Sequence, residues 1–281
     1  MSLSLITVNI GAPSVERARR QLEWLAARPE DIFVLTETKA TPGSELLAQA
    51  CTAANYSVTF PEHDPGELGV MIVSRAATTP DPLTGALSYL PARAAGVIVG
   101  TSDGPLRVLG AYVPSRDATL DKTERKKRWI EGFHTALDAT KSSVPVLLLG
   151  DLNVLEPGHQ PEHRQQFAPF EYDFYRALTD THGLIDAFRH LHPRRVEHSW
   201  ARRPDLGYRY DHAHCSAQLL ALLQGCEYVH QTRDVLADGS RLTDHSGLAV
   251  RLATTARTPL LTSDPATAAP SENKPLEPTL F

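Results

Sequence analysis

The chain has 281 residues, 42% of them hydrophobic and 22% charged, and a formal net charge of −5. This composition is typical of a globular protein with a sizeable core, and the lack of a long apolar run excludes a membrane-spanning chain. The negative charge excludes a protein that binds nucleic acid through its overall charge, so a polyanion would have to meet a local basic patch.

The cysteines and the first residues bear on the cellular compartment. Cys51, Cys215 and Cys226 are odd in number and scattered, which is typical of reduced thiols rather than of a disulfide framework. Residues 1–10 lack a basic start and a long apolar segment, so no signal peptide is predicted. We therefore expect a cytoplasmic protein, and we expect it to be a monomer with no membrane partner.

The first third of the chain predicts strands and helices in alternation. Two of the apolar strands end in polar residues, Asn9 and Glu37, and Ser14 is placed to cap the first helix. The predicted elements are, in order, a strand at Leu3–Asn9, a helix at Val15–Ala27, a strand at Asp31–Glu37, a helix at Gly43–Ala54, and strands at Ser57–Phe60 and Leu68–Ser74.

A hairpin and a long helix follow. The strands Ala94–Gly100 and Leu106–Val113 are joined by a Ser-Asp-Gly-Pro turn, and the second carries Tyr112 near its end. The helix at Asp121–Thr140 has four basic residues in its first turns, Lys126 among them. Because the helix dipole disfavours cations there, a bound phosphate is one interpretation, and a solvated basic face is the other.

The next strand delivers two polar side chains to its end. Val144–Leu149 is a continuous apolar run, as in a strand that is buried on both faces, and Asp151 and Asn153 follow it directly. Alternation along a strand would send both of these side chains to the same side. A carboxylate and a carboxamide at the rim of a buried strand indicate a functional pair, whereas an ordinary strand-end turn is the alternative.

The last third of the chain predicts shorter elements. They are helices at Phe170–Thr181 and Ile185–His190, a strand at Tyr208–Cys215, a helix at Ala217–Leu223, and strands at Cys226–Gln231 and Gly247–Leu252. From Ala253 onward, prolines and small residues without periodicity predict disorder. We expect one domain over residues 1–253 and a disordered tail over residues 254–281.

Polar groups, which a hydrophobic core would reject, thus recur at the ends of the predicted strands. They are Asn9, Glu37, Tyr112, Asp151 with Asn153, Asp211, and Asp244 with His245. Carboxylates and carboxamides with almost no cysteine suit a hard cation such as Mg²⁺ or Mn²⁺. A carboxylate can take a proton from water, and a histidine backed by an aspartate can stay charged beside an oxyanion. This combination suits metal-assisted hydrolysis of a phosphate ester.

On these residues the chain resembles the endonuclease/exonuclease/phosphatase superfamily, and within it the exonuclease III branch of abasic-site endonucleases. The matching motifs run in family order from Leu3 to Leu252. They are Thr-Val-Asn9, Leu-Thr-Glu37-Thr-Lys, Gly-Val-Met-Ile-Val-Ser-Arg75, Gly-Ala-Tyr112-Val-Pro, Gly-Asp151-Leu-Asn153, Asp186-Ala-Phe-Arg-His, Tyr208-Arg-Tyr-Asp211 and Thr-Asp244-His245-Ser. Tyr112, where other branches have a histidine, favours the exonuclease III branch.

The resemblance implies a fold, an activity and a set of roles. The fold would be an α/β, four-layer sandwich of two packed, mostly antiparallel sheets flanked by helices. The activity would be Mg²⁺-dependent phosphodiester hydrolysis of DNA in repair, with Mn²⁺ as a substitute. Glu37 and Asn9 would bind the metal with Asp244 in its outer shell, and Asp151 would activate water. Asn153, Tyr112 and His245 would contact that water or the phosphate, and Asp211 would orient His245.

Substrate binding is assigned to residues outside this set. Trp200 and Tyr208 could stack on a sugar or base, or serve as core aromatics. Arg209 and Lys126 are expected to contact the substrate. A zinc site at His212, His214 and Cys215 is weakly indicated, because a fourth ligand at the right spacing is absent.

Two departures from the family pattern keep the substrate open. Asn9 is followed by Ile-Gly-Ala-Pro-Ser, where relatives have an acidic or amide residue, a glycine and an arginine. The segment from Trp200 to Tyr208 is short, and in relatives this region accommodates a flipped-out abasic sugar. The alternatives are therefore a hydrolase of a small phosphate ester with the same fold, or a nucleic-acid-binding protein with weakened catalysis.

Overall fold

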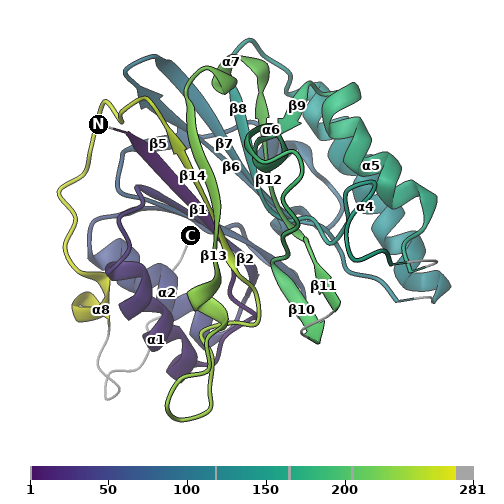
Figure 1. Ribbon diagram of the computed structural model, residues 1–281. Coiled ribbons are helices and arrows are strands. Elements are labelled where there is room, and N and C mark those ends of the chain that lie inside the picture. Colours follow the sequence, from purple (N-terminus) through teal and green to yellow (C-terminus); the bar gives the residue numbers. More distant parts are fainter. Residues whose placement is uncertain (1, 118, 164–165, 204–205, 270–281) are drawn as a thin grey trace.

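The computed structural model describes residues 2–117, 119–163, 166–203 and 206–269, and two six-stranded sheets lie at its centre (Figure 1). The first sheet has the spatial order β13 (Leu223–Val229), β14 (Gly247–Leu252), β1 (Leu3–Asn9), β2 (Ile32–Lys39), β4 (Leu68–Ser74) and β3 (Ser57–Thr59). The second has the order β5 (Thr78–Pro80), β6 (Ala94–Thr101), β7 (Gly104–Tyr112), β8 (Val146–Asp151), β12 (Asp211–Ser216) and β9 (Leu184–Asp186).

Most neighbouring strands are antiparallel, with one parallel pair in each sheet. In the first sheet β1 runs parallel to β2, and in the second β7 runs parallel to β8. A separate two-stranded hairpin, β10 (Trp200–Arg203) with β11 (Leu206–Tyr208), projects from one end of the sandwich. Parallel neighbours end at the same edge of their sheet, so Tyr112 and Asp151 emerge side by side. A hydrogen bond from Asn9 to Asp151 brings the end of β1 to the same place.

Helices cover both outer faces. The helices are α1 (Val15–Ala26), α2 (Pro42–Ala53), α3 (Leu83–Ala86), α4 (Leu120–Ala139), α5 (Pro169–Asp180), α6 (Ala187–Leu191), α7 (Ala217–Leu220) and α8 (Pro265–Ala268), with 3₁₀ turns η1 (Pro91–Arg93) and η2 (His230–Arg233). In Figure 1, α1, α2 and α8 lie against the first sheet and α4 and α5 against the second. Among the described helices, none is both long and apolar enough to cross a membrane.

Alternation along the strands divides the core into three layers. In β2, Ile32 and Val34 face the layer between the two sheets, whereas Phe33 and Leu35 face α1 and α2. Trp129 of α4 packs with the outer face of the second sheet. Both sheets are therefore buried on both faces, which explains why their strands read as continuous apolar runs. The four-layer sandwich expected from the resemblance is confirmed.

Several predicted elements differ from the observed ones. Residues 184–186, predicted as the start of a helix at Ile185–His190, form the edge strand β9, and Asp186 then caps α6 through its side chain. The strand predicted at Tyr208–Cys215 is two strands, because the backbone leaves the hairpin after Tyr208 and joins the main sheet at Asp211. The short elements β5, α3 and the hairpin strand β10 have no clear sequence pattern.

The predicted boundary of the domain is also corrected. Residues 254–269 were expected to be disordered, but they return along the molecule and pack on it. Ala256 bridges to Thr101, Pro259 bridges to Ala76, and the side chains of α8 join the layer formed by α1 and α2. The folded unit therefore extends to residue 269, and residues 270–281 lie outside the described part of the chain.

Candidate active site

Three hydrogen bonds between functional side chains connect the two sheets at one end of the sandwich. Each joins a residue of the first sheet or its loops to a residue of the second sheet. The pairs are Asn9 with Asp151, Glu37 with Tyr112, and His245 with Asp211. Six residues that are far apart in sequence therefore meet, as the sequence analysis expected of them.

Asp151 lies at the centre of this cluster and is 1% exposed. Its Oδ2 accepts a hydrogen bond from Asn9 Nδ2 at 2.9 Å, and its Oδ1 accepts one from the Asn153 amide at 3.0 Å. Burial, followed by the nearby Asp211 carboxylate, raises the pKa of Asp151 to about 7. A carboxylate with this pKa is suited to accept a proton near neutral pH.

The strand that carries Asp151 approaches its neighbour too closely for a side chain at Gly150. A Cβ there would lie 1.9 Å from the Ala111 carbonyl oxygen, and the φ of +151° is one that other residues rarely adopt. Beyond Asp151 the chain turns sharply, because Asn153 has a φ of +49°. The alternation expected to carry Asp151 and Asn153 to the same side thus ends at Asp151. Asn153 Nδ2 donates instead to the Val113 carbonyl at 3.0 Å.

Asp211 and His245 form a buried ion pair, with 2.7 Å between Oδ2 and Nδ1. Burial lowers the pKa of His245, but the Asp211 carboxylate outweighs burial and raises that pKa to about 10. The imidazole is therefore charged at neutral pH. Its Nδ1 is held by Asp211, and among the described residues Nε2 has no hydrogen-bond partner, so it can donate to an incoming oxyanion.

The backbone around Asp211 is fixed by two neighbours that the sequence did not reveal. The hydroxyl of the fully buried Ser199 accepts from the Tyr210 and Asp211 amides, and the Tyr228 hydroxyl donates to the Asp211 carbonyl at 2.6 Å. These bonds hold the end of β12 and thereby fix the direction of the Asp211 side chain.

Glu37 sits on an irregularity of β2. The register with β4 shifts between Thr36 and Thr38, and Glu37 has a φ of +53°. Non-glycine residues at positive φ cluster at functional sites, because the surrounding structure must compensate the strain. The Glu37 carboxylate accepts from the Tyr112 hydroxyl at 2.7 Å. Burial, followed by Glu37, raises the pKa of Tyr112, so the phenol is neutral and remains a donor.

The donor atoms fit a hard divalent cation. A carboxylate oxygen of Asp151 and one of Asp211 lie within 4.8 Å of each other, with the charged His245 ring within the same distance as a hydrogen-bond donor. Asp211 Oδ1 is buried with no hydrogen-bond partner among the described residues. The Glu37 carboxylate contributes to the raised pKa of Asp151 and so lies within electrostatic reach of it. Clustered buried carboxylates repel one another, and a cation is the usual compensation.

Asp244 lies outside the hydrogen-bonded cluster. It is exposed, and its Oδ2 accepts from the Trp200 indole nitrogen at 2.8 Å. The bond ties the β10–β11 hairpin to the loop that carries His245. Trp200 itself is partly exposed and stands 6.0 Å from the Tyr210 ring centroid, so it lies at the edge of the site.

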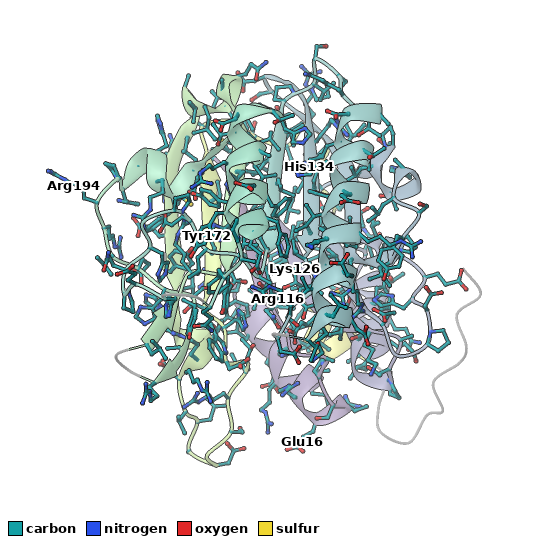
Figure 2. All side chains as sticks on the ribbon, turned by 90° about the vertical axis from the view of Figure 1, so that its right-hand side faces the viewer. Glu16, Arg116, Lys126, His134, Tyr172 and Arg194 are labelled. Atoms are coloured by element: carbon teal, nitrogen blue, oxygen red, sulfur yellow. The ribbon has the colours of Figure 1, made fainter. Side chains whose placement is uncertain are left out.

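Lys126 is buried and bonded within the protein, unlike the surface cation expected from the basic helix end. It is 1% exposed, and its Nζ donates at 2.6 Å to both the Asn153 carbonyl and Glu171. Arg116 pairs with the same glutamate, and Figure 2 shows Lys126 and Arg116 close together. Lys126 therefore holds the turn after Asp151 from behind.

Arg209 is likewise removed from substrate. It is completely buried and donates to Glu156 and to Asp186, with Nη2 2.7 Å from the Asp186 carboxylate. Burial raises the pKa of Asp186, but the Arg209 guanidinium outweighs burial and holds that pKa well below its ordinary value. Arg209 therefore lies inside the protein, bonded through Nε and Nη2 to buried acids, rather than at the surface as expected of a substrate contact.

Tyr208 is an aromatic residue of the core. It is 2% exposed, its ring stacks at 3.9 Å on His163, and its hydroxyl donates to Gln166. The ring of the less buried Tyr210 stacks on it at 5.1 Å. Of the two roles considered for Tyr208, packing is the one the structure shows.

His212 and His214 extend into the buried layer around Asp186. His212 Nε2 lies 3.0 Å from the Val154 carbonyl, whereas both ring nitrogens of His214 are buried without a hydrogen-bond partner among the described residues. Burial lowers the pKa of His214 to about 3, although Asp186 acts in the opposite direction. His214 is therefore neutral in the folded protein and protonates in the unfolded chain below about pH 6.5.

The burial of neutral His214 predicts that the folded protein loses stability at acidic pH, and that replacing His214 removes this part of the loss. Because His214 takes up a proton on unfolding, its contribution is complete above pH 6.5 and is lost progressively as the pH falls toward 3. Between pH 6.5 and 5 the loss amounts to about 2 kcal/mol. H214L should therefore lose less stability than the wild type between pH 7 and 5 in urea unfolding. The exposed H190L is the control, and equal losses in all three proteins would contradict the prediction.

Arg17 was missed in the sequence because it lies on a helix, well beyond the Asn9 motif. The loop after Asn9 folds back, since Gly11 and Ala12 both have positive φ and the Ala12 amide donates to the Glu37 carbonyl. Arg17 donates to the Gly11 carbonyl, and a Cβ on Gly11 would lie 3.3 Å from Arg17 Nη2 and 4.0 Å from Glu37 Oε2. The Arg17 guanidinium therefore lies near the Glu37 carboxylate, although the loop itself has no arginine.

The family model of the endonuclease/exonuclease/phosphatase family matches residues 6–245, which span every residue of the cluster. The chain belongs to this family. The family prediction is thus confirmed, and with it the hydrolase class of the protein.

One curated relative is Recombination repair protein 1 of Drosophila melanogaster, which is 23% identical over 223 residues. The match covers 75% of this chain but 32% of that protein, so the chain spans about a third of its relative's length. The remaining two thirds of that relative lie outside the match.

Three solved structures share the fold. The 3′ phosphatase NExo from Neisseria bound to a product DNA hairpin (TM-score 0.70) and the 3′-5′ exonuclease NExo from Neisseria meningitidis (0.71) are each 24% identical. An AP endonuclease from Archaeoglobus fulgidus is 21% identical, with a TM-score of 0.69. Each comparison covers 89% of this chain and 99% of the other, so the likeness extends over the entire domain.

Proposed function

We propose that the protein is a Mg²⁺-dependent phosphodiesterase that acts on DNA, as an abasic-site endonuclease or at 3′ ends, in DNA repair. The observation that carries the proposal is the meeting of Asp151, Asp211 and His245, whose ligand atoms lie within 4.8 Å of one another. The similar solved structures include a 3′ phosphatase bound to a product DNA hairpin and an AP endonuclease, and this supports DNA as the substrate.

The residues can be given roles from their geometry. Asp151, with a pKa of about 7, accepts the proton of the attacking water. The charged His245, held by Asp211, donates from Nε2 to a phosphate oxygen and stabilises the charge that develops there. Asn153 lies one turn beyond Asp151 and can hold the water or the phosphate.

Glu37 and Asn9 would hold the metal ion, with Asp244 in its outer shell. The metal would supply charge neutralisation at the phosphate and orientation of the reacting group. Mn²⁺ accepts the same oxygen ligands and is expected to substitute for Mg²⁺.

The test uses labelled duplexes that differ in one feature. One carries a single abasic site, one a recessed 3′ end and one a 3′-phosphate, and each is incubated with Mg²⁺, Mn²⁺ or EDTA. We expect strand cleavage or 3′ processing with either metal and none above background in EDTA. A panel of nucleotides and sugar phosphates is run in parallel. Turnover of these with intact DNA would favour the small-ester alternative, and silence on every substrate at enzyme excess would contradict the proposal.

A further inference from the structure

A basic pocket lies beside the catalytic cluster, and none of the six residues of that cluster lines it. It has a volume of about 420 Å³ and lies between the β10–β11 hairpin and the loop of residues 230–244. Both segments project from the end of the sandwich that carries the active site (Figure 1). The charged residues of its lining are Arg202, Arg203, Arg233, Arg241, Asp234 and Asp244, so that cations outnumber acids.

The arginines of this pocket differ from most of the other arginines on the molecule. Arg20, Arg125 and Arg195 each form an ion pair with a carboxylate. In contrast, Arg202, Arg233 and Arg241 form no ion pair with any described residue. Burial lowers the pKa of Arg233 and Arg241 acts in the same direction, whereas the Glu197, Asp211 and Asp234 carboxylates raise it. Four arginines against two aspartates in the lining leave the pocket with an excess of positive charge.

The pocket opens next to the reacting groups. Asp244 lines it, and His245 is the following residue in the chain. The hydrogen bond from Trp200 to Asp244 joins its two walls, so that the hairpin and the loop form one surface. The carboxylate of Asp211 acts on the pKa of Arg233, which places Arg233 within electrostatic reach of the Asp211–His245 pair.

The chemistry of these walls favours a phosphate group. A guanidinium presents a planar fork of donors that matches phosphate oxygens and stays charged at all physiological pH values. Nucleic-acid backbones carry a phosphate at every nucleotide, so a strand whose reacting phosphate lies at His245 brings its neighbours alongside. The location of the pocket and its positive charge thus both favour a phosphate group as the ligand.

We propose that this pocket, the arginine pocket of residues 202, 203, 233 and 241, binds a backbone phosphate of DNA next to the one that reacts. The inference rests on the proposed function, because it takes DNA as the substrate. In this inference the arginine pocket positions the DNA strand, and the Asp151 cluster carries out the reaction.

The test is a charge-removal variant with a matched control. R233Q/R241Q removes two cations from the arginine pocket. R251Q/R257Q removes two exposed cations at the opposite end of the sheets, where Arg251 pairs with Ser4 of β1 and the Arg257 amide donates to the Gly100 carbonyl. Binding of a labelled duplex with an uncleavable abasic analogue is measured in EDTA at several salt concentrations. R233Q/R241Q should weaken binding about tenfold and lower the salt slope by about 1.5 to 2, and the control should do neither.

A neutral phosphate locates the contact. A methylphosphonate placed on one or the other side of the cleaved bond should weaken binding by the wild type at one of the two positions. At that position it should weaken R233Q/R241Q no further, because the contact is already lost. Equal effects of the two double variants, or methylphosphonate effects that simply add to those of R233Q/R241Q, would overturn the inference. Absence of cleavage by the wild type would overturn the proposed function instead, and the binding comparison would still decide the inference.

Discussion

D151N is expected to lower the rate of DNA cleavage by roughly 10²- to 10⁴-fold without lowering the thermal stability of the protein. The catalytic loss follows because an amide cannot accept the proton of the attacking water. The retained stability follows because the Asp151 carboxylate is buried near other acids. Its pKa is raised from 3.8 to about 7, so its ionisation lowers the stability of the fold as the pH rises from about 3.8 to 7, and the full loss is present at pH 8. Asn remains neutral at every pH.

The measurement combines single-turnover cleavage at saturating enzyme with thermal unfolding at pH 8 in EDTA. We expect the Tm of D151N to equal or exceed that of the wild type, while its binding to uncleaved DNA persists. The control is D180N on the exposed end of α5, which removes the same charge far from the cluster and should retain wild-type cleavage. A D151N protein that cleaves at the wild-type rate would contradict the assignment of Asp151 as the proton acceptor.

R209M is expected to lower the free energy of unfolding by about 3–5 kcal/mol, the largest stability effect that the structure predicts. The guanidinium is fully buried and bonds to Glu156 and Asp186. Methionine can fill part of the same volume, but it takes a buried cation away from two buried acids. Glu156 then keeps only Arg189, and Asp186 keeps its bonds from the Tyr175 hydroxyl and the Arg189 amide. The loss therefore comes from the stranded acids rather than from the missing packing.

Urea unfolding at pH 7 provides the measurement. The control is R195M, which breaks a partly exposed ion pair with Glu227 and should cost less than about 1 kcal/mol. The double variant R209M/D186N should recover part of the loss, because it neutralises one of the stranded carboxylates. If R209M and R195M are equally mild, the Arg209 network does not stabilise the fold in the way its burial indicates.

The sequence predicts the strands and the identity of the site residues for physical reasons that the structure makes clear. Both sheets are covered on both faces, so their strands appear as apolar runs such as Val144–Leu149, and a polar residue in or after such a run stands out. Asn9, Glu37 and Asp151 were found in this way. Their joint presence at one rim follows from the parallel pairs β1–β2 and β7–β8.

The errors also have a common cause. Lys126 and Arg209 look like surface cations, because their partners Glu171, Glu156 and Asp186 are distant in sequence and only the tertiary fold joins them. A charge is assigned to solvent or substrate until its buried counter-charge is known. The bulge at Glu37 and the reversal after Asn9 depend on single backbone angles, and propensities do not fix such angles.

Because three hydrogen bonds of the active site cross between the sheets, the site is complete only when both sheets are packed together. Neither half of the sandwich carries a complete set of catalytic groups, since each bond takes one partner from each half. A chain whose two halves have not yet packed together lacks the complete set of catalytic groups, even where its strands and helices are formed. Hydrolysis is thereby restricted to molecules that have finished folding.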